Sequence, residues 1–220
     1  MDGAGKGAHL NPDAAGARTI VFDFGGVLVD WNPRHLYRKL FGGDEAAMER
    51  FLEEIGFSGW NSQQDLGRPF GVAVAELVGR FPHYGDLIRA YDERWEESIA
   101  GPIQASVDLL APLKRAGREL HGLSNWSSEK FALARAKFGF FALFDTILVS
   151  GDVKLGKPDP RIFELFLRRI GKTARECLFI DDSAANIKAA RGLGFETIHF
   201  SSADQLQGEF RARGLLAAEV

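Results

Sequence analysis

The chain has 220 residues, of which 45% are hydrophobic and 26% are charged, a composition that excludes disordered and fibrous proteins. Its 27 lysine and arginine residues against 30 aspartate and glutamate residues give a net charge of -3, so no broad cationic surface is expected for nucleic acid. The length favours one compact unit with a sizeable insertion over two large domains.

The first segment, residues 1–18, is rich in glycine and alanine and lacks the charged and apolar regions of a secretory signal. We therefore predict a flexible tail there. The longest apolar stretch, residues 138–149, is interrupted by Asp145 and is too short to span a bilayer. The single cysteine, Cys177, lies in an apolar run and is expected to be buried. These features predict a cytoplasmic protein, monomeric or homodimeric, that binds neither membrane nor nucleic acid.

Five short apolar runs, each followed by small or polar residues, predict buried strands at residues 19–22, 119–123, 146–149, 177–180 and 196–200. Helical periodicity occurs between them at residues 105–116, 128–138, 160–170 and 186–193. Asp159 is placed to cap the third of these helices with Pro160 at its first position, and Gly194 to end the fourth. The alternation predicts an α/β fold, a doubly wound parallel sheet of the Rossmann-like kind.

The segment from residue 31 to residue 101 interrupts this alternation. It shows no convincing strand but has helical periodicity at residues 34–41, 45–55, 72–81 and 86–98. We predict a tail at residues 1–18, an α/β core made of residues 19–30 and 102–220, and an inserted α-helical cap domain at residues 31–101.

Polar and charged residues follow the predicted strands, where ligands bind in open parallel sheets. Taken singly, each has a structural explanation as a turn residue, a helix cap or a surface charge. Together, three carboxylates, an ammonium and a hydroxyl at one sheet edge suit a divalent cation and an anionic group. These residues are Asp23, Ser124, Lys157, Asp181 and Asp182, and Asn125 stands next to Ser124.

Four segments carry a family resemblance: Val-Phe-Asp-Phe-Gly-Gly-Val-Leu-Val-Asp at 21–30, Leu-Ser-Asn at 123–125, Gly-Lys-Pro-Asp-Pro at 156–160 and Phe-Ile-Asp-Asp at 179–182. In order and spacing, they resemble the four motifs of the haloacid dehalogenase-like (HAD) hydrolases. The resemblance spans about residues 19–200, and members with a helical cap carry it after the first motif.

The resemblance implies a role for each matching residue. Asp23 corresponds to the nucleophile that forms a covalent aspartyl intermediate, and Ser124 to the hydroxyl that binds the transferring group, with Asn125 beside it. Lys157 corresponds to the lysine that neutralises nucleophile and phosphoryl oxygens. A Mg²⁺ cofactor is implied, with Asp181 as ligand. The full implied metal set is Asp23, the Gly25 carbonyl, Asp181 and Asp182.

One position departs from the family pattern. Many phosphatases of this family have a second aspartate two residues after the nucleophile, as general acid and base, and this chain has Gly25 there. We hypothesise that a cap residue, Asp30 or a substrate-bound water supplies the proton. Trp31 and Trp126 are candidates for the walls of the substrate pocket, with core packing as the alternative.

The sequence thus predicts Mg²⁺-dependent hydrolysis of a small phosphate monoester through an aspartyl-phosphate on Asp23. The alternative is a metal-independent 2-haloacid dehalogenase that uses the same nucleophile, which the missing second aspartate favours and the pair Asp181-Asp182 disfavours. A third possibility is a phosphate-binding protein that keeps the fold without turnover.

Overall fold

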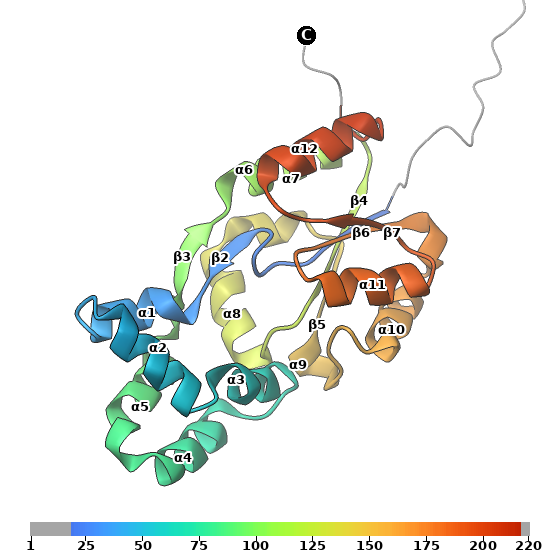
Figure 1. Ribbon diagram of the computed structural model, residues 1–220. Coiled ribbons are helices and arrows are strands. Elements are labelled where there is room, and N and C mark those ends of the chain that lie inside the picture. The colour runs from blue at the N-terminus through green and yellow to red at the C-terminus, as the bar shows by residue number, and fades with distance from the viewer. Residues whose placement is uncertain (1–18, 217–220) are drawn as a thin grey trace, which may run out of the picture.

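A parallel sheet of five strands lies at the centre of the computed structural model, which describes residues 19–216 (Figure 1). The strand order is β5 (Thr146–Val149), β4 (Glu119–Ser124), β1 (Thr19–Phe22), β6 (Cys177–Asp181) and β7 (Glu196–His199). The middle strand β1 pairs with both neighbours, so that Thr19 lies opposite Glu119 and Cys177. The predicted doubly wound α/β fold is confirmed, whereas the predicted tail lies outside the described residues.

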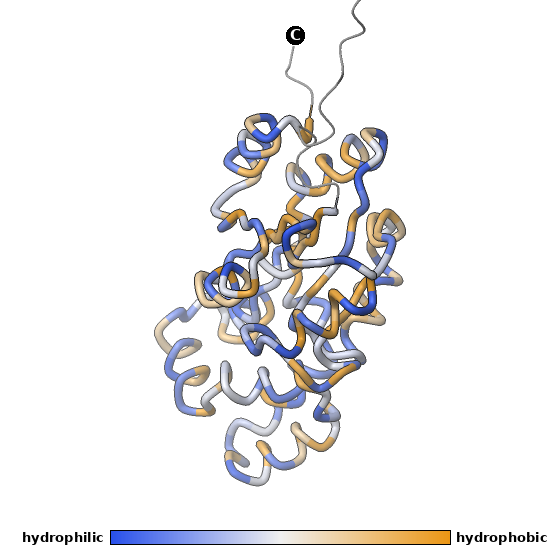
Figure 2. Tube along the Cα trace, turned by 90° about the vertical axis from the view of Figure 1, so that its right-hand side faces the viewer, coloured by the Kyte–Doolittle hydropathy of each residue, from blue (hydrophilic) through white to orange (hydrophobic). Residues whose placement is uncertain are grey.

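Side chains of β1 alternate between two apolar layers because successive strand residues point to opposite faces. Ile20 and Phe22 belong to the cluster under α7 (Leu110–Arg115), α8 (Ser128–Lys137) and α12 (Ala203–Ala212). Val21 belongs to the cluster under α10 (Pro160–Ile170) and α11 (Ala184–Gly192). Figure 2 shows the hydrophobic strand segments in the interior of the molecule. Cys177 is fully buried, as predicted.

A helical segment lies between β1 and β4 in the chain and forms the lobe at the lower left of Figure 1. Its helices are α1 (Pro33–Leu40), α2 (Glu45–Glu54), α3 (Phe57–Asp65), α4 (Phe70–Arg80) and α5 (Gly85–Glu93), with 3₁₀ turns at Pro82–Tyr84 and Trp95–Ser98. One apolar cluster runs from the sheet through Val29 into this lobe, where it includes Tyr37 and Trp95. The lobe and the sheet therefore share a hydrophobic core.

The expectation that this segment has no strand was wrong. β2 (Val29–Trp31) and β3 (Ile99–Pro102) form an antiparallel pair where the chain enters and leaves the helical lobe. Both strands are too short to show a period of two in the sequence. The two chain segments that connect the helical lobe to the sheet therefore run side by side as this strand pair.

Several helix predictions need correction. The helix expected at residues 105–116 is divided into α6 (Gln104–Val107) and α7, because Pro112 would clash with the Asp108 carbonyl in a continuous helix. The helix expected at 86–98 ends at Glu93 and is followed by the 3₁₀ turn Trp95–Ser98. α3 and α12 were not predicted from the periodicity.

Other local predictions are confirmed. The Asp159 side chain accepts a hydrogen bond of 2.9 Å from the Arg161 backbone and caps α10, with Pro160 at the first position. Gly194 has a positive φ of 94°, the left-handed conformation that glycine adopts without strain. Among residues 19–216, no helix has the length and apolar character needed to cross a membrane.

Candidate active site

Three polar side chains meet at the carboxyl edge of the sheet because their strands are neighbours. Asp23 follows β1, Ser124 ends β4 and Asp181 ends β6, on either side of the middle strand. The Asp23 backbone amide donates a 2.8 Å hydrogen bond to the Ile180 carbonyl, which extends the pairing of β1 and β6 by one step. The register therefore sets the spacing between these side chains.

The Asp23 carboxylate is held through one of its oxygens. Its Oδ1 accepts hydrogen bonds from the Ser124 hydroxyl at 2.6 Å and the Phe24 amide at 2.7 Å. The Lys157 ammonium lies 3.0 Å from the same oxygen. The hydrogen bonds that described residues make to this carboxylate thus converge on Oδ1 and leave Oδ2 facing no protein donor.

Lys157 is a buried cation between two carboxylates. Its Nζ lies 2.7 Å from Asp181 Oδ2 as well as 3.0 Å from Asp23, and its side chain is fully shielded from solvent. Burial alone would lower the pKa of Lys157, but the charges of Asp23 and Asp181 outweigh it and raise the pKa above its usual value. The lysine is therefore a fixed positive charge at this edge.

Asn125 contacts the backbone of Lys157. Its side-chain amide donates to the Lys157 carbonyl and accepts from the Lys157 amide, both at 2.8 Å. Asn125 was predicted to lie beside Ser124 as a catalytic residue. In the structure its polar atoms are used to fix the loop that carries the lysine, although the residue also borders the cavity described below.

The carboxylates of Asp23, Asp181 and Asp182 form one group, with oxygens within 4.8 Å of one another. Asp181 is fully buried and accepts hydrogen bonds from the Ser183 amide at 2.8 Å and from Asn186 at 3.0 and 3.1 Å. Burial raises the pKa of Asp182, and the adjacent charge of Asp181 raises it further. Burial likewise raises the pKa of Asp23, against the opposing charge of Lys157.

The two glycines after Asp23 differ in their surroundings. Gly26 has a φ of 72°, and a Cβ there would lie 2.2 Å from an oxygen of Asp182, so a larger residue would displace that carboxylate. A Cβ on Gly25 would meet no atom within 4 Å. The missing second aspartate of the family pattern is therefore not explained by lack of space at Gly25.

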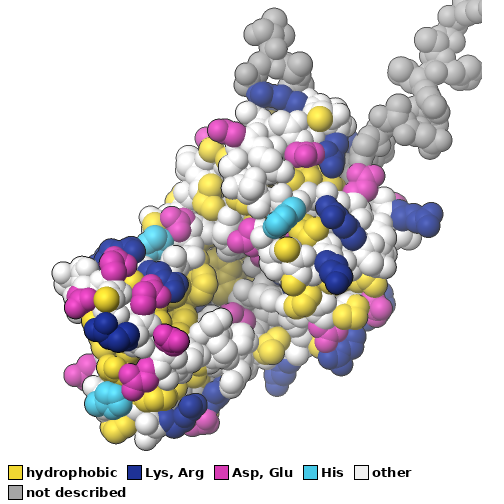
Figure 3. Space-filling view, viewed as in Figure 1, with side chains coloured by type: hydrophobic (Ala, Val, Ile, Leu, Met, Phe, Trp, Pro, Cys, Tyr) yellow, Lys and Arg dark blue, Asp and Glu magenta, His cyan; other side chains and the backbone are white. Residues whose placement is uncertain are grey.

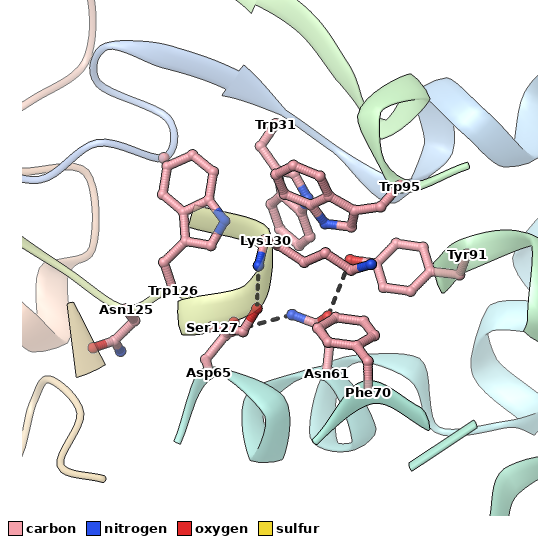
Figure 4. A pocket seen from close by; sticks show the side chains of 11 residues that line it. Trp31, Asn61, Asp65, Phe70, Tyr91, Trp95, Asn125, Trp126, Ser127 and Lys130 are labelled. Carbon is pink, nitrogen blue, oxygen red and sulfur yellow. Dashed lines mark hydrogen bonds between the residues drawn. The ribbon is translucent and has the colours of Figure 1, made fainter. Parts of the chain in front are cut away.

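A cavity lies between this edge and the helical lobe, and Figure 3 shows a recess between the two with hydrophobic side chains at its depth. Its volume is about 50 Å³, room for a few water molecules. Five of the eleven residues that line it carry aromatic rings (Figure 4). The lining residues are Gly25, Trp31, Asn61, Asp65, Phe70, Tyr91, Trp95, Asn125, Trp126, Ser127 and Lys130.

The cation in this lining is already paired. The Lys130 ammonium donates to the Asp92 carbonyl at 2.9 Å, forms an ion pair with the Asp92 carboxylate, and lies 4.5 Å from the centre of the Phe70 ring. The positive charge of Lys130 is therefore already neutralised by Asp92.

The family model for haloacid dehalogenase-like hydrolases matches residues 17–194 of the chain. The chain belongs to this hydrolase family. The sesquiterpene phosphatase astK of Aspergillus oryzae is 26% identical over 189 residues, which cover 84% of this chain and 90% of that protein. (S)-2-haloacid dehalogenase 4A of Burkholderia cepacia is 30% identical over 96 residues, 44% of this chain and 42% of that protein.

Solved structures agree in fold. A HAD family enzyme from Bacteroides thetaiotaomicron, crystallised as a magnesium complex, superposes with a TM-score of 0.69 at 23% identity, covering 89% of this chain and 99% of that one. The relatives of this hydrolase thus include both phosphatases and dehalogenases.

The structure of the HAD hydrolase brings Asp23, Ser124, Lys157, Asp181 and Asp182 together and places Trp31 and Trp126 in the cavity wall. It does not place Asp30 there. The Asp30 side chain is 51% exposed and lies 2.9 Å from His35, and it is absent from the cavity lining. Asp30 lies on β2 outside the cavity lining, although it is close to Asp23 in sequence.

Asp65 was missed by the sequence analysis. It is the last residue of α3 and the carboxylate of the cavity lining. Nothing in its neighbourhood, Gln-Gln-Asp-Leu-Gly, distinguishes it from a residue at a helix end. The glycine at position 25 was the available signal, because it led to the expectation that a cap residue, Asp30 or a substrate-bound water supplies the proton.

Proposed function

We propose that this hydrolase cleaves a small phosphate monoester in a Mg²⁺-dependent reaction through a covalent aspartyl-phosphate on Asp23. The observation that carries the proposal is the buried Lys157 ammonium between Asp23 and Asp181, with the Asp182 carboxylate in the same group. A nucleophilic carboxylate beside a fixed cation and two further carboxylates suits the transfer of an anionic group with the aid of a metal.

The donor set fits Mg²⁺. Three carboxylates face one ammonium, which leaves two uncompensated negative charges, and hard oxygen ligands are those that this ion prefers. We assign the ligand positions to Asp23, Asp181, Asp182 and the carbonyl of Gly25. When bound, Mg²⁺ would supply positive charge that polarises the phosphoryl oxygens.

The protein groups around Asp23 orient its attack. Because Ser124, the Phe24 amide and Lys157 all engage Oδ1, the carboxylate is held in one orientation with Oδ2 available to attack phosphorus. The new Asp23–phosphorus bond forms as the bond from phosphorus to the leaving oxygen breaks. Water then cleaves the aspartyl-phosphate and releases phosphate, with Lys157 and Ser124 positioned to bind the phosphoryl oxygens.

The cavity suggests the size and character of the leaving group. Its aromatic wall includes Trp31, Trp95 and Trp126, and its volume is about 50 Å³. We therefore propose a short leaving group with apolar surface, bound between the sheet edge and residues 31–101, which act as the cap domain. The substrate is then a small phosphorylated molecule.

Dehalogenation of a 2-haloacid is the second candidate, favoured by the aromatic cavity and by the absence of a side chain at Gly25. A haloacid brings its own carboxylate, which needs a counter-charge. Within the cavity lining the cation is Lys130, and Asp92 already neutralises it. The arrangement therefore supports phosphatase activity more strongly.

Phosphate and halide release from a panel of phosphate esters and 2-haloacids tests both candidates. We expect phosphate release that requires Mg²⁺, stops with EDTA and is abolished in Asp23→Asn. Halide release that is indifferent to EDTA would replace the phosphatase proposal with the dehalogenase. No release of either product by the wild-type protein would favour a phosphate-binding role.

A further inference from the structure

Asp65 is fixed to the catalytic side of the molecule by its backbone. The Ser150 hydroxyl donates to the Asp65 carbonyl, and the Trp126 amide donates to the same hydroxyl at 2.9 Å. Ser150 is fully buried and directly follows β5, whereas Trp126 follows β4. The end of α3 in the cap is thus attached to α9 (Ser150–Val153) and to the loop after β4, at the carboxyl edge of the sheet.

The residues that follow Asp65 are packed tightly against α9 and the loop after it. A Cβ on Gly67 would lie 2.8 Å from the Gly151 carbonyl oxygen, and a Cβ on Gly156 would lie 2.9 Å from the Leu66 side chain. Contacts this close leave no room for another side chain. Gly156 also precedes Lys157, so the turn after Asp65 adjoins the loop that carries the catalytic lysine.

The Asp65 carboxylate is held in the cavity by a short chain of hydrogen bonds, visible in Figure 4. Tyr91 donates to Asn61 Oδ1 at 3.0 Å, which fixes the amide so that Asn61 Nδ2 donates to Asp65 Oδ2 at 3.1 Å. Tyr91 and Asn61 are buried. Asp65 and Gly25 line the same cavity, and a Cβ on Gly25 would meet no atom within 4 Å, so the carboxylate borders the space next to the residue that departs from the family pattern.

We propose that Asp65 is the general acid and base of this hydrolase, supplied by the cap in place of the residue missing at Gly25. The inference rests on the phosphatase function proposed above. As Asp23 attacks phosphorus and the bond to the leaving oxygen breaks, the Asp65 carboxyl gives its proton to that oxygen, which departs as an alcohol. The Asp65 carboxylate then takes a proton from the water that attacks the aspartyl-phosphate, and is protonated again.

The electrostatic surroundings support this role. Burial raises the pKa of Asp65 to about 7. A hydrogen bond from the Ser127 backbone lowers this pKa, and the negative charge of Asp23 raises it. Lys130, the cation in the same lining, is neutralised by Asp92. A carboxyl that titrates near neutral pH can act first as acid and then as base.

The test compares two small substrates that differ in their need for a proton. Acetyl phosphate releases a stable carboxylate anion, whereas ethyl phosphate must release an alcohol. In Asp65→Asn we expect single-turnover release of ethanol from ethyl phosphate to fall about 10²- to 10⁴-fold, the usual range for a lost general acid, and release of acetate from acetyl phosphate to change by less than about fivefold. Hydrolysis of the aspartyl-phosphate, in which Asp65 acts as the base, should slow by the same factor with both substrates. Asp30→Asn, an exposed carboxylate outside the cavity, is the matched control and should leave both rates unchanged.

Gly25→Asp in the Asp65→Asn background provides a rescue, because the position has space for a side chain. We expect the double variant to release ethanol from ethyl phosphate at least ten times faster than Asp65→Asn. Equal losses of leaving-group release from both substrates in Asp65→Asn, or no loss of ethanol release from ethyl phosphate, would overturn the role of Asp65. Absence of Mg²⁺-dependent phosphate release from either substrate by the wild-type protein would instead overturn the proposed function.

Discussion

Replacing Lys157 by methionine removes the positive charge between two buried carboxylates while keeping a side chain of similar length. The ammonium lies 3.0 Å from Asp23 and 2.7 Å from Asp181, and the side chains of Lys157 and Asp181 are fully shielded from solvent. Breaking a buried pair by removing one partner costs about 3–5 kcal/mol, which is a large part of the stability of a typical domain. We expect Lys157→Met to lose about this much free energy of unfolding at pH 8.

The loss should depend on pH in a definite direction. The charge of Lys157 lowers the pKa of Asp23, so its removal raises that pKa further in the folded state. A raised carboxyl pKa contributes stability that is present at low pH and lost as pH rises. The deficit of Lys157→Met relative to wild type should therefore be smaller at pH 5 than at pH 8.

Urea denaturation of both proteins at the two pH values measures this difference. Lys172→Met is the control, because Lys172 forms a 2.7 Å ion pair with Glu119 at the surface, where such pairs contribute about 0–1 kcal/mol. If Lys157→Met is as stable as Lys172→Met at pH 8, the reasoning that Lys157 compensates the buried carboxylates is wrong.

Three further outcomes follow from the contacts around the site. Ser150→Ala removes the hydroxyl that joins the Asp65 carbonyl to the core, so we expect a loss of about 1–3 kcal/mol in urea denaturation and faster hydrogen exchange after α3. Gly26→Ala places a Cβ against Asp182, so the Mg²⁺ concentration for half-maximal activity should rise at least tenfold; an unchanged value would remove Asp182 from the ligand set. Burial raises the pKa of Asp65 to about 7, so wild type should lose stability relative to Asp65→Asn as pH rises from about 4 to 7. The same difference in melting temperature between the two proteins at pH 5 and at pH 8 would contradict this.

The sheet and the residues at its edge could be predicted from the sequence because their signals are local. Each strand is a short apolar run, and Asp23, Ser124 and Asp181 stand directly at the strand ends. The parallel arrangement then brings these ends together without further information. The family resemblance added the chemical roles, and the family model supports membership independently.

α3 could not be predicted because half of its buried stripe is polar. Phe57, Trp60, Asn61 and Gln64 face the interior at helical spacing, but two of the four are amides. An apolar pattern is therefore absent, and the amides find partners in Tyr91 and in the Trp60 carbonyl.

The position of Asp65 depends on the same missed helix. Its place in the cavity is set by a long-range contact with Ser150 and by the packing of Leu66 and Gly67 against Gly156 and Gly151, which no local pattern reveals. Asn125 is a similar case, since its bonds to the Lys157 backbone depend on how two distant loops meet.

The central place of β1 has a consequence for how the chain folds. β1 leaves the ribosome before both of its partners, because it pairs with β4 near residue 119 and with β6 near residue 177. During synthesis the helices α1 to α5 can form from local contacts before β1 has either of the strands that cover it. Pairings of such long sequence separation form slowly and expose nascent chains to aggregation. Synthesis past residue 181 is thus the earliest point at which the polar side chains of this sheet edge can assemble, so a truncated chain that ends before β6 would lack both Asp181 and the strand that pairs with β1 next to Asp23.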